Sequence, residues 1–97
     1  MYYIIIMSYN ILPYSYKEAQ ILGVEIKPSK NKNKKIDVYK NGKKVASIGA
    51  IGYGDYPHYL KVNKDLAKKK RTEYHLRHYK DIQKVNSPGW YAAKILW

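Results

Sequence analysis

The fold is set by one stretch, residues 36–48, which reads IDVYKNGKKVASI. Apolar and polar residues alternate on both sides of Asn41-Gly42, which is the pattern of two half-buried strands. Asn-Gly is the strongest short signal for a two-residue hairpin, because a type I′ turn needs a positive φ at both central positions. The stretch therefore predicts an antiparallel hairpin in which Ile36 and Val38 share one face.

Upstream of the hairpin, the pattern predicts a short helix and a further strand. Residues 15–18 (SYKE) fit a capping box with Ser15 as the N-cap. The helix would end at Leu22, where Gly23 is suited to the left-handed conformation that closes a helix. Residues 24–26 then alternate, which indicates a strand that stops at Pro28.

An apolar run, MYYIIIMSYNIL, occupies residues 1–12. A membrane-spanning helix needs about 20 such residues. No basic residue precedes the run and no small-residue cleavage site follows it, so neither a membrane segment nor a secretory signal is expected. Residues 2–6 (YYIII) are typical of a strand within the fold or of an arm that pairs with a second copy in a homodimer. Both interpretations are open at this point.

Downstream of the hairpin, glycines at 49, 52 and 54 break regular structure before a long helix. Asn63 is a good N-cap for that helix, which is expected to reach Val85 before residues 86–89 (NSPG) stop it. A short helix over residues 90–97 would add Trp90 and Trp97 to the core. On the long helix, Ala67, Tyr74, His78, Ile82 and Val85 fall on one face, and Lys69, Lys70, Arg77, Lys80 and Lys84 on another.

These elements make one small α+β domain over residues 1–97, with residues 1–12 as an extra strand or exchanging arm. Its antiparallel sheet of about three strands packs with a short N-terminal helix, a long basic helix and a short C-terminal helix. The chain has 97 residues and no cysteine, which excludes disulfides, thiol catalysis and Cys-ligated zinc. No metal or other cofactor is expected.

Charge is the clearest functional signal in the chain. There are 19 Lys+Arg against 7 Asp+Glu, a formal net charge of +12. Residues 1–26 carry a net charge of −1 and residues 27–97 one of +13, which suggests a packing part and a binding part. Within the second part, residues 27–44 and 61–80 are two separate basic regions, which favour a polyanion as partner.

Lysine supplies 17 of the basic residues and arginine only 2. A lysine is a point charge that suits phosphate groups, whereas arginine reads guanine through two hydrogen bonds. The composition therefore predicts binding to the phosphate backbone with little sequence choice. The predicted contacts are Lys30, Lys32, Lys34, Lys35, Lys43 and Lys44 from the hairpin side, and Lys68, Lys69, Lys70, Arg71 and Arg77 from the helix. This prediction requires that the two groups converge on one surface.

Several of these residues can also be explained by structural roles that involve no ligand. Charged side chains spaced four apart, such as Glu73 and Arg77, often only decorate a solvated helix. Four tyrosines can stack on unpaired bases but are favoured as half-buried edges of the core; they are Tyr39, Tyr53, Tyr56 and Tyr59. Catalysis or metal binding by His58, His75 and His78 lacks a supporting motif, so the chain is predicted not to be an enzyme.

A series of short motifs resembles a known family over residues 27–97. The motifs are Pro28-Ser29, Lys34-Lys35, Gly42-Lys43-Lys44, Ile48-Gly49-Ala50 with Tyr53 and Asp55-Tyr56, Tyr74-His75-Leu76-Arg77-His78, Gly89-Trp90 and Leu96-Trp97. Their order resembles a domain family of unknown function found in small basic proteins of large nucleocytoplasmic DNA viruses. The resemblance implies a viral protein located in the virion, the host cytoplasm or the nucleus. It also implies a role for Arg77, either on a phosphate or paired with Asp55.

The sequence thus predicts a non-enzymatic protein that binds nucleic acid without sequence preference and is packaged with the genome. DNA is favoured over RNA, and no membrane or small-molecule substrate is expected. The alternative is a structural or interaction protein that acts through a homodimer or an acidic viral or host partner.

Overall fold

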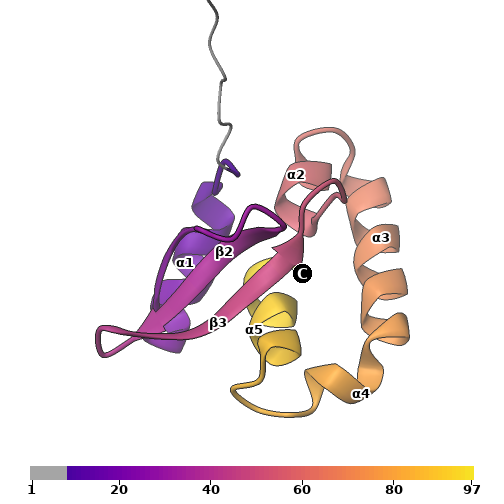
Figure 1. The fold of residues 1–97 in the computed structure, drawn as a ribbon. Helices are drawn as coiled ribbons and strands as arrows, with labels where there is room; N and C mark the ends of the chain where they lie inside the picture. The colour runs from indigo at the N-terminus through magenta and orange to yellow at the C-terminus, as the bar shows by residue number, and fades with distance from the viewer. Residues whose placement is uncertain (1–8) are drawn as a thin grey trace, which may run out of the picture.

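The computed structural model of the chain describes residues 9–97, and these form an open three-stranded sheet packed with helices (Figure 1). The elements in chain order are α1 Pro13–Leu22, β1 Glu25–Pro28, β2 Lys34–Lys40, β3 Lys43–Ala50, α2 Tyr56–Leu60, α3 Lys64–Arg77, α4 Tyr79–Ile82 and α5 Pro88–Ile95. The predicted α+β class is confirmed. The two interpretations of residues 2–6 lie outside the described residues.

The hairpin forms as predicted. Asn41 and Gly42 have φ angles of 52° and 79°, as a type I′ turn requires. Strands β2 and β3 pair antiparallel with Ile36 opposite Ile48, and a register shift between Val38 and Tyr39 marks a bulge. Strand β1 adds to the other edge of β2, so β2 is the central strand.

Helix α1 begins earlier than expected, which corrects the role assigned to Ser15. Leu12 is the N-cap and Pro13 opens the helix, as proline at the first helical position often does. Ser15 is fully buried, and its hydroxyl donates to the Ile95 carbonyl at 2.8 Å. Its side chain therefore links α1 to the end of α5. The predicted helix end is confirmed, because Gly23 adopts φ 76° in a left-handed cap.

The core lies between one face of the sheet and helices α1 and α5. Ile36, Val38 and Ile48 are buried on the strands, and Tyr91 and Ile95 of α5 pack against them. In Figure 1, α5 lies between the sheet and α3. The C-terminal helix is thus the central packing element, and it separates the hairpin from the basic helix.

The predicted long helix is divided in two. Asn63 caps α3 as expected, and its side chain accepts from the Leu66 N–H at 2.9 Å. The helix ends at Arg77 and not at Val85, because His78 leaves helical geometry with φ −108° and ψ 19°. The resulting turn brings α4 close to α5: a Cβ on Gly89 would lie 2.8 Å from the Asp81 Cβ.

Within residues 9–97, none of the helices has the length and hydropathy of a bilayer span.

Gly49 is a sensitive position in this arrangement. Both Gly49 and Gly52 have positive φ angles, 79° and 96°. A Cβ on Gly49 would lie 2.8 Å from Leu96 Cδ1 and from Lys35 Cδ, whereas a Cβ on Gly52 would meet no atom within 4 Å. We expect Gly52→Ala to lower the free energy of unfolding by about 1–2 kcal/mol through backbone strain alone. Gly49→Ala adds a steric clash of about 1–3 kcal/mol to that strain.

Urea denaturation of the two variants beside the wild type measures the difference. Equal losses in the two variants would show that the close packing of Leu96 and Lys35 around Gly49 does not contribute.

Candidate functional site

A buried ion pair connects the sheet to the loop that follows it. The side chains of Lys35 and Asp55 are 5% and 1% exposed, and Lys35 Nζ lies 2.9 Å from Asp55 Oδ2. Lys35 Nζ also donates to the Tyr53 carbonyl at 2.6 Å. The prediction that Lys35 binds phosphate is therefore wrong, because its ammonium group is enclosed and already neutralised.

Three further groups complete the environment of Asp55. The Tyr9 hydroxyl donates to Asp55 Oδ2 at 2.6 Å, His58 Nδ1 lies 2.7 Å from Oδ1, and the His58 backbone N–H donates to Oδ1 as the N-cap contact of α2. Burial alone would raise the pKa of Asp55. Hydrogen bonds from Tyr9, Lys35 and His58 lower it by more than burial raises it, so the pKa of Asp55 lies below its usual value. The partners of Asp55 are thus Lys35, Tyr9 and His58, and of the two alternatives for Arg77, the pairing with Asp55 does not form.

Asp37 is a second buried carboxylate, on β2. It accepts hydrogen bonds from the Ser29 and Ser47 hydroxyls at 2.6 and 2.7 Å and from the Lys30 N–H at 3.2 Å. Burial raises the pKa of Asp37, while these hydrogen bonds outweigh burial and bring the pKa below its usual value. Asp37 therefore holds the start of the lysine-rich loop against the sheet. The charge of exposed Lys44 also lowers the pKa of Asp37, so this buried carboxylate still attracts a surface lysine.

A cleft of about 600 Å³ lies between β3 and α3. Its lining includes three residues of α5, which are Pro88, Gly89 and Ala92. Four predicted site residues line it, together with the acid Glu73: Lys34, Lys70, Arg77 and the ion-paired Lys35. Lys70 and Arg77 are seven residues apart, about two helical turns, which places them on one face of α3. The cleft is thus where the two basic regions of the sequence meet.

Aromatic rings form much of the remaining wall. The rings of Tyr74 and Trp97 stack at 4.5 Å with 9° between their planes, and the rings of Tyr74 and His78 stack at 4.3 Å with 29°. Tyr74 is thereby covered on both faces. All three rings line the cleft with Tyr53 and Tyr59. Tyr74 and His78 were predicted on a face separate from Lys70 and Arg77, and the structure corrects this, because all four side chains border one cavity.

Arg71 has a structural role that its sequence context does not indicate. Its Nε donates to the Trp97 carbonyl at 2.6 Å, and its guanidinium lies 4.3 Å from the centre of the Tyr56 ring. These contacts attach the end of the chain to α3 and to α2. Arg71 is therefore removed from the group of residues available to phosphate.

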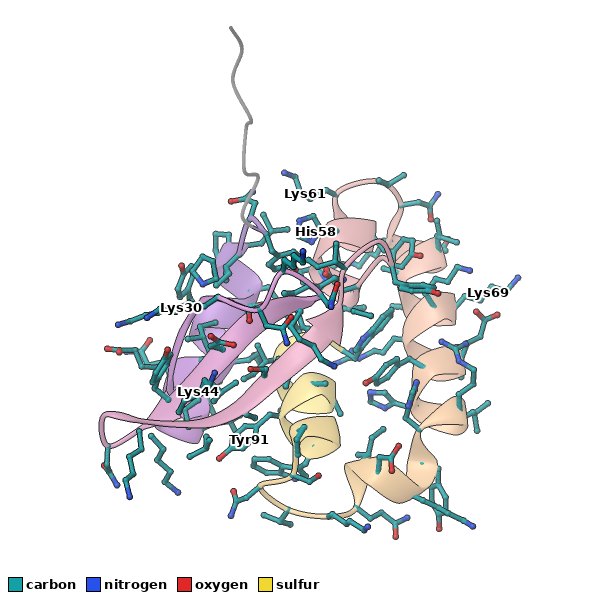
Figure 2. The ribbon with its side chains drawn as sticks, in the orientation of Figure 1. Lys30, Lys44, His58, Lys61, Lys69 and Tyr91 are labelled. Carbon is teal, nitrogen blue, oxygen red and sulfur yellow. The ribbon has the colours of Figure 1, made fainter. Side chains whose placement is uncertain are left out.

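The remaining predicted contacts do not form one patch. Lys30 and Lys44 lie on the sheet side of the molecule, and Lys69 extends from the opposite side of α3 (Figure 2). The expectation that all of these lysines converge is wrong, because α5 separates the hairpin from α3. All of them remain exposed except Lys70, which is half-buried; the exposed ones are Lys30, Lys32, Lys34, Lys43, Lys44, Lys68 and Lys69.

The tyrosine prediction holds for three of the four residues. Tyr56 is buried and Tyr39 and Tyr59 are half-buried, whereas Tyr53 is 74% exposed at the rim of the cleft. Gly54, next to it, allows the Tyr59 ring to approach: a Cβ on Gly54 would lie 2.5 Å from that ring. A sequence pattern cannot distinguish Tyr53 from its neighbours, since its exposure depends on the path of the glycine loop.

The histidines lie in different environments. His58 contacts Asp55, whereas His78 lies in the aromatic stack of the cleft. Burial and the nearby charge of Arg71 lower the pKa of His75. Across residues 9–97, no three His, Cys, Asp or Glu side chains cluster as a metal site would require.

The chain was compared with protein families, curated proteins and solved structures. The chain matches no protein-family model, and no curated protein or solved structure shows significant similarity to it. The viral resemblance of residues 27–97 stays a prediction.

The buried carboxylate makes the stability of the fold pH-dependent. The folded state lowers the pKa of Asp55, so its contribution is complete above its unfolded pKa of about 3.9 and is lost as pH falls through the lower folded pKa. Asp55→Asn leaves Lys35 buried and unpaired, and we expect it to cost about 3–5 kcal/mol at neutral pH. The difference in the free energy of unfolding between Asp55→Asn and the wild type should become smaller as the pH is lowered towards about 3.

Denaturation curves measured over that pH range provide the test. Asp65→Asn is the control, because Asp65 is exposed on the first turn of α3, where the substitution costs about 0.3–1 kcal/mol. A gap between Asp55→Asn and the wild type that stays constant with pH would contradict the assignment.

Proposed function

We propose that this protein binds nucleic acid through the phosphate backbone, with little sequence preference and without catalysis. The observation that supports it most strongly is uncompensated surface charge. Two of the acids, Asp37 and Asp55, are buried, whereas Lys35 is the basic residue that the core encloses. Among residues 9–97, the ion pairs that lysine or arginine forms at the surface are Lys27–Glu25 and Lys70–Glu73, both at 3.8 Å.

The arrangement of the lysines suits an extended ligand. Lys43 and Lys44 are exposed next to the hairpin turn, and Lys34 connects that side of the molecule to the cleft. Lys70 and Arg77 continue the basic surface on α3. A polyanion that crosses the cleft meets both basic regions, whereas a compact anion meets one. This favours a strand of phosphates over a small ligand as the general partner.

The viral resemblance extends the proposal to a genome-associated protein in the virion or the infected cell, with DNA favoured over RNA. An acidic protein partner, or a homodimer, is the competing proposal for the same charge. When lysines neutralise the phosphates of a nucleic acid, the counterions condensed on it are released. A flexible acidic peptide carries fewer condensed counterions, so fewer are released when it binds. Salt dependence and competition therefore separate the two proposals.

The test is a titration of a labelled DNA duplex of about 20 base pairs at salt concentrations from about 50 to 200 mM. With about six phosphates engaged, log K should fall against log salt with a slope near −5. Replacing Lys43 and Lys44 together with Gln should reduce that slope by about 2 and affect unrelated sequences equally. Lys17→Gln, an exposed control on α1 outside both basic regions, should leave the slope nearly unchanged.

Two results would overturn the proposal. One is an affinity that does not depend on salt, and the other is an absence of binding at low salt. If poly-glutamate displaces the DNA at equal charge concentration, the acidic-partner proposal replaces it.

A further inference from the structure

The cleft between β3 and α3 has the size and chemistry of a ligand site. Its volume of about 600 Å³ lies within the range of about 300–1,000 Å³ that is typical of small-molecule pockets. Its wall combines aromatic rings with cationic groups, which is the composition that recognises a planar ring attached to an anion. Phosphate binding alone needs only exposed lysines, so the rings call for a separate explanation.

The rings offer stacking surfaces that the fold does not fully use. Tyr53 is 74% exposed at the rim, where a ring of this size gains little from packing. In the stack of Trp97, Tyr74 and His78, the Trp97 ring also meets Tyr59 and packs against the core, whereas the His78 side chain is 41% exposed. A nucleobase can stack on such a ring whatever its sequence, because every base has a π-face.

The cationic side chains of the cleft suit an anionic ligand. Lys70 and Lys34 lie on opposite walls, and Arg77 forms no ion pair within 4 Å among residues 9–97. Glu73 is the acid of the lining, at 3.8 Å from Lys70, and the ammonium of Lys35 is neutralised by Asp55. The cleft is therefore cationic overall, and Glu73 adds an acceptor for an amino or hydroxyl group.

A base inside a duplex cannot use this site. Both of its faces are covered by neighbouring base pairs, and it must leave the stack before a side chain can contact them. A nucleotide in a single strand has no such cost.

We propose that the cleft binds one unpaired nucleotide, with its base against the aromatic rings and its phosphate on Lys70 and Arg77. This rests on the proposed function and makes the protein selective for single strands or exposed bases within it. The lysines outside the cleft provide affinity for any nucleic acid, and the cleft provides the preference for unpaired bases.

The experiment compares a labelled oligothymidine with a duplex of equal phosphate content at one salt concentration. Tyr53→Ala should weaken binding to the single strand about 5- to 150-fold, the loss expected for one stacked base, and leave duplex binding unchanged. Tyr79→Ala is the matched control, because Tyr79 is 62% exposed on α4 and does not line the cleft. Both tyrosines are exposed, so neither variant should fail to fold.

A second pair of variants tests the phosphate contact. Lys70→Gln should weaken binding of adenosine monophosphate, followed by Trp fluorescence, more than Lys69→Gln does. The two lysines are adjacent on α3, but Lys69 points away from the cleft (Figure 2). Equal effects of the two substitutions would overturn the assignment of the phosphate.

The outcomes separate this inference from the proposed function. Equal affinity for single strand and duplex, with no effect of Tyr53→Ala, would overturn the inference while salt-dependent binding still supported the general function. Binding of the mononucleotide without salt-dependent binding of either polymer would overturn the proposed function and leave the cleft as a nucleotide site.

Discussion

The ion pair between Lys35 and Asp55 is the contact on which the remaining geometry depends. Burying two charges costs several kcal/mol each, and the cost is offset only when every remaining polar group finds a partner. Here Tyr9 and His58 share the carboxylate, and the Tyr53 carbonyl takes a further hydrogen bond from the ammonium. Among residues 9–97, no buried side-chain nitrogen or oxygen lacks a hydrogen-bond partner. The pair thereby fixes central strand β2 to α2 and to the glycine loop that carries Tyr53.

The opposite wall of the cleft is held by the end of the chain. Trp97 stacks on Tyr74, and its carbonyl accepts from Arg71, so α3 is attached at two points to the residues that follow α5. Ser15 attaches the same region to α1 through the Ile95 carbonyl. Because α5 also packs on the sheet, the distance between β3 and α3 is set by one short helix. The cleft is therefore a product of tertiary packing, and its walls come from segments far apart in the sequence.

Local chemistry explains which parts of the fold could be predicted. Asn41-Gly42, Gly23 and Asn63 act within a few residues of their own positions, and the structure confirms the turn, the helix end and the helix start that each indicates. Ser15 and His78 behave differently. Ser15 makes a buried contact to the end of α5, and the chain turns at His78 so that Asp81 of α4 lies close to Gly89. Lys35 shows the limit most clearly. Strand alternation places Lys34 on the face of Ile36, yet Lys35 is the buried lysine, because its ammonium pairs with Asp55, which lies 20 residues further along the chain.

The distribution of charge between the inside and the outside of the molecule follows from the same buried contacts. Asp37 and Asp55 stabilise the loop and the sheet from within, and among residues 9–97 neither forms an ion pair with an exposed lysine. A net charge of +12 on 97 residues destabilises the compact state through repulsion among like charges. Part of the stability that the buried contacts provide is therefore offset by repulsion among the cationic side chains at the surface. A polyanion that binds only the folded state relieves this repulsion and adds its own binding free energy to stability. Stability and the proposed binding function are thus coupled through the arrangement of two carboxylates that never reach the surface.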